Sequence, residues 1–394
     1  MLSAAVPLPS AGPSAGPPAD PPADLPPAVL RQAKRLPKVL LHEHLDGGLR
    51  IPTLSALLRD RGIAAPANDE ASLAAWFDAR ANAGSLEEYL RGFALTVAAM
   101  ATPEALARVA FEAAEDALAE GCVLAEFRIA PLLFEPHGVP GDAAVAALLS
   151  GLSRSALPCG LIVCAMRHDP DAQIERAADL ALRWHALPTQ TLPSQAGQAR
   201  QARVVGFDLA GPEAGWPASR HAALLRRVRD AGLGLTLHAG EADDGQRVLE
   251  AARLGAQRVG HGVRLADLLT DAGAADTLAE LRARNVHLEI CPTSNLHTGA
   301  AASLALHPIH ALWRAGLSLS FHTDNPLMSR ITHSGEAAGL VQAGFGWADL
   351  LQMGLDAAAA SFLGPATRAA ARQTLLDWAR AEGLAPARPL RPSP

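Results

Sequence analysis

The sequence predicts an α/β protein built as a (β/α)8 barrel (TIM barrel), and two observations carry this prediction. First, eight short apolar runs typical of strands recur along the chain, at 38–42, 123–129, 160–166, 204–209, 234–238, 258–260, 286–291 and 317–321. Second, Ala- and Leu-rich stretches with helical periodicity lie between them, for example 103–119 and 221–231. Strands that alternate with helices predict a parallel sheet, and eight such units fit a closed barrel.

The spacing of the runs locates the largest insertion. From the second run onward they recur at intervals of about 25 to 45 residues, the size of one strand–helix unit. Residues 51–120 separate the first run from the second, so we expect extra helices inserted after the first strand. A doubly wound open sheet is the structural alternative. The residues at the end of the first run, LHEHLDGG, match neither Gly-rich phosphate-binding pattern that would support it.

Composition argues against several functional classes. The chain has 394 residues, of which 49% are hydrophobic, enough for a sizeable core. Lys and Arg number 34 against 40 Asp and Glu, and the net charge of −6 does not suit a general nucleic-acid binder. Every apolar stretch falls short of the roughly 18–20 residues of a membrane span. The four cysteines form no CxxC pair, which argues against a disulfide scaffold or a Cys-rich zinc module.

The two ends of the chain differ in composition from the rest. Residues 1–30 are mostly Ala, Pro, Ser and Gly, with no Lys or Arg. Repeated prolines interrupt any apolar run of the kind that a secretory signal needs. We therefore expect a disordered extension over 1–30, one barrel domain over 31–385, a flexible tail over 386–394 and a cytoplasmic location.

Polar side chains gather at the ends of the predicted strands. The carboxyl ends of the strands of a barrel share one face, and this face holds the active site. Six of the runs end in residues able to bind a metal, move a proton or form hydrogen bonds, namely His42, His44, Asp46, Asp208, His238, Glu241, His261, Ser294, Asn295, Asp324 and Asn325. Asp208 is expected either to hold its loop or to touch substrate, whereas Ser294 and Asn295 are interpreted as turn formers.

Four of these residues form a plausible metal-ligand set. Alternate residues of a strand point to the same side, so His42 and His44 can converge on one ion. His238 adds a third imidazole, and Asp324 adds a carboxylate oxygen. Three His and one carboxylate suit a borderline divalent ion, most often zinc, with one position left for water. Such an ion lowers the pKa of bound water toward neutrality.

Two further residues are candidates for proton transfer. Glu241 follows His238 by three residues in a Gly-containing turn, so it can reach a substrate without being a ligand, and we expect it to be a general acid. His261 lies between two glycines and can accept the proton of the water or stabilise the hydroxide. The H-x-H pair alone is a weak signal, whereas the full set is a strong one.

The chain resembles the adenosine deaminase family, metal-dependent barrel hydrolases that act on adenine-type amino groups. The resemblance extends from residue 36 to about residue 375 and rests on five motifs in one order. They are LPKVLLHEHLDGGLR (36–50), GFDLAGPE (206–213), LTLHAGE (235–241), RVGHGVRL with LEICPTSN (258–265 and 288–295) and FHTDNPLMS (321–329).

The resemblance implies a role for each candidate residue. It implies one zinc ion per chain, on His42, His44, His238 and Asp324. It further implies that Glu241 protonates ring N1 of the purine while His261 assists the attacking water. The backbone of Gly211 would approach N3, and Asp46 matches the position that binds a ribose hydroxyl. Water would add at C6, and ammonia would leave.

One position departs from the commonest pattern of the family. Many members carry TDD where this chain has Thr323, Asp324 and Asn325. The last of these would face purine N7, a hydrogen-bond acceptor, and an Asn amide donates to it directly whereas an ionised Asp cannot. Asn325 is therefore compatible with an adenine ring, although the departure leaves the substrate less defined.

The function expected from these observations is hydrolytic deamination of adenosine and 2′-deoxyadenosine to their inosine forms, a step of purine salvage. The expected partner is a small-molecule nucleoside, with no nucleic acid and no membrane, and the oligomeric state stays open. The nearest alternative is the same chemistry on adenine or on an adenosine with a 5′ substituent, such as aminodeoxyfutalosine. AMP is disfavoured because the Asp46 carboxylate would repel a 5′-phosphate.

Alternatives from other classes have less support. A non-catalytic metal-binding protein on this scaffold would need neither Glu241 nor His261. Related barrel hydrolases often carry a carboxylated lysine between two metals, but the only lysines here are Lys34 and Lys38, and neither is a candidate for that position. A cytidine-deaminase type of zinc site requires H-x-E with P-C-x-x-C, which the sequence lacks.

Overall fold

The computed structural model describes residues 25–81, 86–187, 201–270 and 273–389. Eight parallel strands form one sheet in sequence order, so each strand pairs with the next one along the chain. The strands are β1 (Lys38–Leu40), β2 (Cys122–Ile129), β3 (Cys159–Met166), β4 (Arg203–Ala210), β5 (Gly234–Ala239), β6 (Arg258–His261), β7 (His287–Ile290) and β8 (Ser318–Phe321). The predicted (β/α)8 barrel, with its eight strands, is confirmed.

The barrel closes between its first and last strands through candidate site residues. Backbone bridges connect Glu43 with Asp324 just beyond the ends of β1 and β8. The Asp324 amide donates to the His42 carbonyl at 3.0 Å, and the His44 amide donates to the Asp324 carbonyl at 2.8 Å. The contacts that close the barrel therefore also bring three candidate ligands, His42, His44 and Asp324, together.

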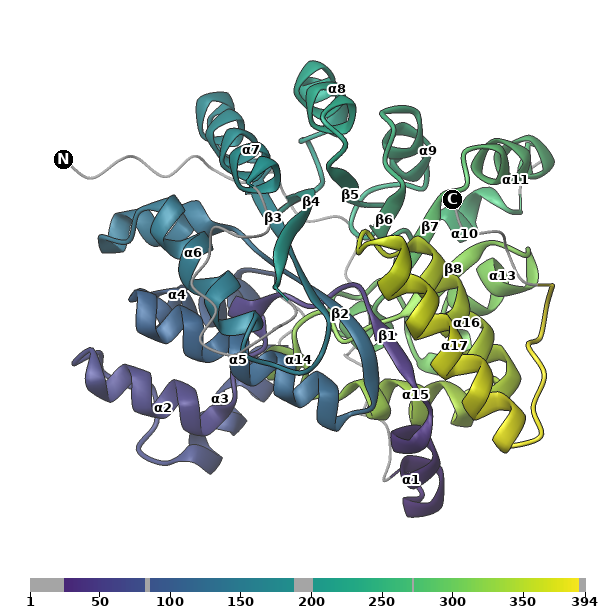
Figure 1. Ribbon diagram of the computed structural model, residues 1–394, viewed down its shortest axis with the longest axis horizontal. Coiled ribbons are helices and arrows are strands. Elements are labelled where there is room, and N and C mark those ends of the chain that lie inside the picture. The colour runs from purple at the N-terminus through teal and green to yellow at the C-terminus, as the bar shows by residue number, and fades with distance from the viewer. Residues whose placement is uncertain (1–24, 82–85, 188–200, 271–272, 390–394) are drawn as a thin grey trace.

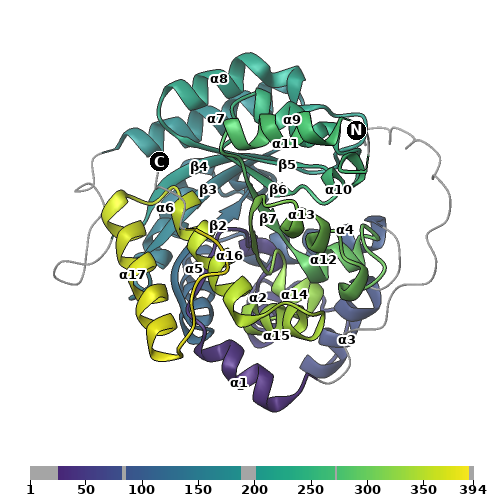
Figure 2. The same ribbon diagram turned by 90° about the vertical axis from the view of Figure 1, so that its right-hand side faces the viewer.

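Helices surround the sheet (Figures 1 and 2). Three of them, α2 (Ile51–Asp60), α3 (Glu70–Ala81) and α4 (Leu86–Met100), form the predicted insertion after the first strand. The others are α5 (Pro103–Ala119), α6 (Gly141–Leu152), α7 (Asp171–Ala186), α8 (Ala222–Asp230), α9 (Gln246–Arg253), α10 (Leu265–Leu268), α11 (Ala274–Ala283), α12 (Pro292–His297), α13 (Ile309–Arg314), α14 (Pro326–Ser329), α15 (His333–Gln342), α16 (Trp347–Ala360) and α17 (Pro365–Ala381), with α1 (Pro27–Arg35) ahead of the barrel.

Local sequence explains where a helix such as α5 begins and how closely it packs. The Thr102 side chain accepts a hydrogen bond from the Ala105 amide, and proline occupies the first helical turn, where its missing N–H costs nothing. Helix α5 then packs on α6 at Gly151, where a Cβ atom would lie 2.2 Å from the Ala107 carbonyl oxygen. Only glycine permits this approach of the two helices.

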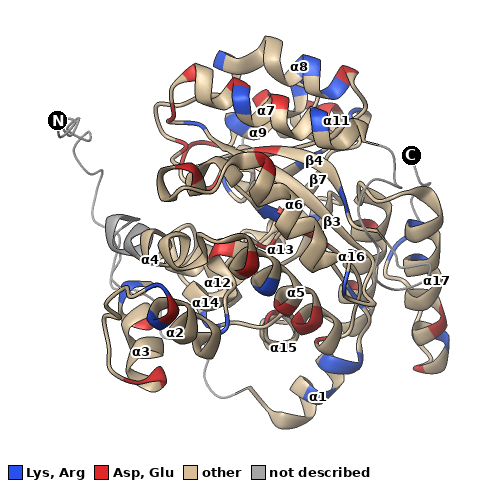
Figure 3. Ribbon diagram, turned by 60° about the vertical axis from the view of Figure 1, so that its left-hand side comes forward, with Lys and Arg blue, Asp and Glu red and all other residues tan. Residues whose placement is uncertain are grey.

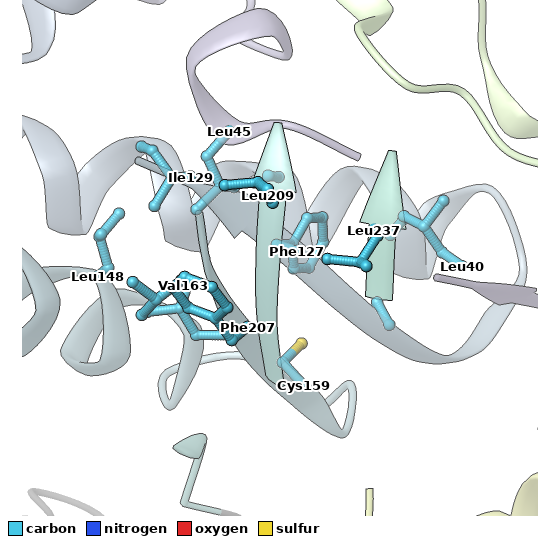
Figure 4. Close-up of a cluster of buried hydrophobic side chains, with 14 of the residues drawn as sticks. Leu40, Leu45, Phe127, Ile129, Leu148, Cys159, Val163, Phe207, Leu209 and Leu237 are labelled. Carbon is cyan, nitrogen blue, oxygen red and sulfur yellow. The ribbon is translucent and has the colours of Figure 1, made fainter. Parts of the chain in front are cut away.

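Alternation along the strands separates an apolar layer from a polar interior. Phe127 and Ile129 of β2 pack with Leu148 of α6 and with neighbouring apolar side chains of β3 and β4 (Figure 4). The intervening β2 residues, Glu126 and Arg128, point to the opposite side and are fully buried. The hydrophobic core lies between the strands and the outer helices, whereas the barrel interior contains charged side chains.

The amino-terminal end of the barrel is plugged by Phe362, which lies between α16 and α17. Cβ atoms on Gly206 and Gly234 would lie 2.9 Å and 2.3 Å from the Phe362 ring, so these strand positions must stay small. The other end of the barrel, where β1 and β8 close, holds the candidate site.

The amino-terminal boundary differs in part from the sequence-based expectation. Residues 1–24 lie outside the described part of the chain, but α1 begins at Pro27, inside the segment expected to be disordered. The reason is burial, because Val29 and Leu30 pack partly against the hydrophobic core. Ala33 of the same helix is completely buried. Apolar side chains spaced at helical intervals therefore begin before residue 31.

The carboxyl-terminal segment also differs in part. Residues 390–394 lie outside the described part, but Arg388, in the segment expected to be flexible, is docked. Its backbone amide donates to Gln352 Oε1 at 3.2 Å, and its guanidinium lies 3.5 Å from the centroid of the Trp313 ring. Cation–π stacking and a backbone hydrogen bond hold this residue on the barrel.

The surface carries charges of both signs, in agreement with the nearly equal numbers of basic and acidic residues. Lys and Arg intermix with Asp and Glu on outer helices such as α8 and α17 (Figure 3). Within the described residues, no single helix is long and apolar enough to cross a membrane, and only the sharply bent pair 92–100 and α5 meets the length and composition test when taken together.

Candidate active site

The four predicted metal ligands meet at the mouth of the barrel. One potential ligand atom each from His42, His44, His238 and Asp324 lies within 4.8 Å of all the others. His44 Nε2 and His238 Nε2 are 3.3 Å apart, and Asp324 Oδ1 lies 3.3 Å from His42 Nε2 and 3.5 Å from His44 Nε2. His42 and His44 lie just beyond β1 rather than within it, but they converge as their spacing predicted.

Buried carboxylates fix the outer nitrogens of two of these imidazoles. His42 Nδ1 lies 2.9 Å from Glu289 Oε2, and His238 Nδ1 lies 2.9 Å from Asp208 Oδ2. Each Nδ1 therefore donates its proton outward, which leaves the Nε2 lone pair directed at the centre of the cluster. Carboxylates behind metal-binding imidazoles commonly fix ring orientation in this way.

The donor set fits a divalent cation. His42 Nε2 is buried without a hydrogen-bond partner among the described residues. The Nε2 atoms of His44 and His238 lie 3.3 Å apart, so a cation at the centre of the cluster could be reached by both rings. Three imidazole nitrogens and a carboxylate oxygen are ligands that zinc accepts.

Formal charge gives an independent argument. Inside the barrel the carboxylates of Glu126, Asp208 and Glu289 pair with the guanidinium groups of Arg128 and Arg258, and Asp324 adds a further buried carboxylate. With neutral imidazoles, these four carboxylates exceed the two guanidinium groups by two negative charges. Buried charge without compensation is costly, and one divalent cation balances this excess.

Protonation of the imidazoles follows their surroundings. Burial lowers the pKa of His238 to about 4 and holds the pKa of His44 well below its ordinary value, so both rings are neutral near pH 7. Burial and the Arg128 charge oppose protonation of His42, but Asp324 and Glu289 outweigh them and raise its pKa.

Two site residues adopt backbone conformations that non-glycine residues rarely adopt. His261 has φ +62° and Asp324 has φ +57°. Such conformations cost of order 1–3 kcal/mol and persist where the surroundings enforce them. The two backbone hydrogen bonds that close the barrel enforce the Asp324 conformation. The Ser294 hydroxyl then donates to Asp324 Oδ2 at 2.6 Å and orients the carboxylate.

The two predicted proton-transfer residues lie beside the ligand cluster. His261 Nε2 lies 3.4 Å from Glu241 Oε2, and the His261 ring centroid is 5.0 Å from that of His42. Burial raises the pKa of Glu241 above its ordinary value, which favours the protonated acid. Asn295 Nδ2 lies 3.1 Å from His261 Nδ1 and donates to it, which leaves Nε2 as the ring nitrogen that can carry a proton.

The predicted substrate-binding residues surround the same mouth. Asp46 is buried, its Oδ1 has no hydrogen-bond partner among the described residues, and burial raises its pKa to about 7. Asn325 packs over Gly47, where a Cβ atom would lie 1.9 Å from Asn325 Oδ1. Gly211 has φ +90°, and a Cβ atom there would lie 3.1 Å from His168 Nδ1.

Several supporting residues were not identified from the sequence. Ser294 and Asn295, interpreted there as turn formers, orient Asp324 and His261. Asp208 holds the His238 imidazole and pairs with Arg128, which is neither of its two expected roles, because it is buried inside the barrel and not in a loop. Glu289 and Arg128 had a sequence signal that was not used, because each is a charged residue inside an otherwise apolar strand.

A further carboxylate holds the loop that carries Glu241. Glu213 accepts hydrogen bonds from the backbone amides of Gly240, Glu241, Ala242 and Asp243. One buried side chain thereby fixes a whole turn. Only the fold brings Glu213 to this turn, since it follows β4 and the turn follows β5.

Cys291 also lies close to the ligand cluster. Its Sγ is within 4.8 Å of ligand atoms of His42, His261 and Asp324. Burial raises the pKa of the Cys291 thiol well above its ordinary value, so the group stays a neutral thiol and a poor metal ligand.

Comparison with known proteins shows the family of the chain. The family described as adenosine deaminase matches residues 37–378. The chain belongs to the adenosine deaminase family. It is 41% identical over 351 residues to the adenosine deaminase of Mycobacterium tuberculosis strain H37Rv. This match covers 85% of this chain and 92% of that protein. It is also 41% identical over 359 residues to the adenosine deaminase of Mycobacterium avium, covering 86% and 93%.

Solved structures share the fold. An adenine deaminase from Arthrobacter aurescens superposes with a TM-score of 0.75 at 24% identity, covering 88% of this chain and 99% of that one. An amidohydrolase from Burkholderia ambifaria, solved with bound Zn, has a TM-score of 0.75 at 25% identity, covering 93% and 97%. The chain is therefore an enzyme of a metal-dependent deaminase family, a hydrolase that acts on carbon–nitrogen bonds.

Proposed function

We propose that this member of the adenosine deaminase family hydrolyses adenosine and 2′-deoxyadenosine to inosine and 2′-deoxyinosine, with release of ammonia, using one zinc ion. The observation that carries the proposal is the convergence of His42, His44, His238 and Asp324 directly beside the Glu241–His261 pair. When bound by these four residues, zinc would supply Lewis acidity that makes water nucleophilic near neutral pH.

Glu241 supplies the proton in this mechanism. Burial raises its pKa and so favours the protonated carboxyl group, which can donate to ring N1. Protonation at N1 withdraws electrons from C6, where water adds and forms the new carbon–oxygen bond. The two protons of that water restore the Glu241 carboxyl group and convert the amino group to ammonia, which leaves as the C6–amino bond breaks.

His261 holds the attacking oxygen. Because Asn295 donates to Nδ1, the ring presents its N–H at Nε2, beside Glu241. A fixed donor at this position stabilises negative charge that develops on the oxygen during addition at C6. We therefore assign His261 stabilisation of the oxygen, one of the two roles expected from the sequence.

The substrate side of the mouth suits a nucleoside. The partnerless Asp46 oxygen is an acceptor for a ribose hydroxyl, and a carboxylate there disfavours a 5′-phosphate. The Asn325 amide would donate to N7, and the Gly211 backbone amide would donate to N3. A free nucleoside substrate places the reaction in purine salvage, and we propose the cytoplasm as its location.

Ammonia release from a matched set of substrates tests the function. The purified protein is incubated with adenosine, 2′-deoxyadenosine, adenine, AMP and a 5′-modified adenosine, and kcat/KM is measured for each. We expect the first two to be the best substrates. Faster turnover of adenine or of the 5′-modified adenosine would replace the proposed substrate, and no ammonia from any of the five would refute the proposed reaction.

A further inference from the structure

Arg128 occupies the centre of the barrel interior and contacts two of the carboxylates described above. Its side chain is completely buried. Nη1 lies 2.8 Å from Asp208 Oδ2, and Nη2 lies 2.6 Å from Glu289 Oε2. Nη2 also donates to the Leu41 carbonyl at 2.7 Å, one residue before His42. One guanidinium thus connects β2 with β4, β7 and the end of β1.

The contacts of Arg128 continue directly to two ligand imidazoles. Glu289 Oε2 is shared between Arg128 and His42 Nδ1, and Asp208 Oδ2 is shared between Arg128 and His238 Nδ1. We infer that Arg128 is a positioning residue that couples His42 and His238, so that both present Nε2 to the same cation. This inference rests on the metal site of the proposed function.

The geometry suits arginine and not lysine. Two nitrogens of one planar group contact carboxylates from two different strands, whereas a lysine ammonium is a single point of charge on a flexible stem. Without the guanidinium, Asp208 and Glu289 face each other as buried anions with a partner missing. Each then shifts or takes up a proton, and the imidazole it holds loses its fixed orientation.

Charge and positioning predict opposite results, which makes the inference testable. A cationic side chain near the site repels a metal ion, so loss of Arg128 through charge alone would tighten metal binding. Loss of positioning would weaken it instead. Changes behind metal-binding imidazoles typically lower metal affinity about 10- to 100-fold.

Arg258 provides a matched control. It is also completely buried and paired, but its partners are Glu126 Oε2 at 2.6 Å and the other Glu289 oxygen, Oε1, at 2.5 Å. Substitution of Arg258 removes the same charge from the same interior and one partner of Glu289, but it leaves Arg128 on the two oxygens that hold His42 and His238.

The experiment measures zinc affinity of the chelator-treated full chain by competition with a chromophoric chelator, for the parent, Arg128→Met, Arg128→Lys and Arg258→Met. Melting temperatures of the metal-free proteins are recorded beside it. We expect both Arg128 variants to bind zinc about 10- to 100-fold more weakly and Arg258→Met to stay within about threefold of the parent. If Arg128→Met does not fold, the zinc affinity of Arg128→Lys decides whether Arg128 positions the ligands.

A second variant tests the path of the coupling. If Arg128 acts partly through Asp208, the losses in zinc affinity for Arg128→Lys and Asp208→Asn are not additive in the double variant. Unchanged or tighter zinc binding in the Arg128 variants would overturn the inference while leaving the metal site intact. A parent protein that binds no zinc would instead refute the metal site itself.

Discussion

At the floor of the barrel both carboxylate oxygens of Glu126 have hydrogen-bond partners. At the mouth, His42 Nε2 has no hydrogen-bond partner among the described residues. Glu126 Oε1 accepts from the Ser361 hydroxyl at 2.5 Å and from the Phe362 amide at 2.6 Å, and Oε2 pairs with Arg258. The mouth also holds Asp46 Oδ1, another buried atom without a hydrogen-bond partner among the described residues.

Backbone conformation also distinguishes the two ends of the barrel. The non-glycine residues with positive φ include His261 and Asp324 at the mouth. The floor is closed by ordinary packing of Phe362 against glycines of β4 and β5. The floor thus pairs both oxygens of its carboxylate and closes by apolar packing, whereas the mouth combines a strained backbone with potential ligand atoms that converge on one point.

The largest expected effect is at the mouth. Asp324→Ala removes the only carboxylate among the four ligands, so metal binding and turnover should be lost together. The fall in kcat should exceed the roughly 10²–10⁴ that general acid–base catalysis contributes. Elemental analysis and ammonia release on one preparation check this, and an active, chelator-treated enzyme without metal would contradict it.

A neighbouring change at the mouth should separate proton transfer from metal binding. Glu241→Gln keeps the shape and hydrogen-bonding capacity of the side chain but cannot deliver a proton to N1. We expect kcat to fall by roughly 10²–10⁴ while zinc content and substrate affinity stay close to those of the parent. A fully loaded Gln variant that turns over within a few-fold of the parent would remove Glu241 from its role as the acid.

The matching change at the floor should affect stability instead of chemistry. Glu126→Ala leaves Arg258 buried without one of its anions and removes the acceptor for the Ser361–Phe362 turn. Breaking a buried pair in this way destabilises by about 3–5 kcal/mol. Urea unfolding measures the loss, and kcat per metal-loaded, folded molecule should stay within a few-fold. A large fall in kcat with little loss of stability would break the distinction between floor and mouth.

A pH-dependent effect, absent at acid pH, is expected at Glu336, whose Oε1 accepts from the Thr293 amide at 3.1 Å, just ahead of Ser294 and Asn295. Burial raises the pKa of Glu336 to about 8 from an unfolded value near 4.5. The folded state therefore binds this proton more tightly. Its stabilising contribution is complete below pH 4.5 and is lost as the pH rises through 8.

Glu336→Gln removes this titration because the amide is neutral at every pH. Relative to the parent, the variant should gain stability progressively between pH 5 and pH 8, with at most about 1.4 kcal/mol per pH unit from this group. Urea unfolding of both proteins across this range checks the slope. A difference that does not change with pH would show that Glu336 does not titrate in the folded protein.

The architecture and the chemical groups of the site were predictable from local information. Alternation of apolar runs with helical stretches indicated the eight-stranded barrel, because strand and helix periodicities are properties of short segments. Spacing placed His42 and His44 on one side, and the strand-end positions brought His238, His261 and Asp324 to one face. Their roles as ligands and proton carriers remain predictions.

The supporting contacts were not predictable in the same way. Arg128 contacts Asp208 and Glu289, which are 80 and 161 residues further along the chain. No local pattern encodes which buried charges meet across the interior. The docked Arg388 and the start of α1 were missed for a related reason, because composition describes a segment but not the surface it packs on.

The sequence by itself thus determined which secondary structures form and which chemical groups lie at the strand ends. Only the tertiary structure decided how those groups are oriented. Closure of β1 against β8 sets the Asp324 backbone, and Arg128 fixes the carboxylates behind His42 and His238. The physical reason is that secondary structure depends on neighbours along the chain, whereas the direction of a buried side chain depends on partners that only the closed barrel brings within hydrogen-bond distance.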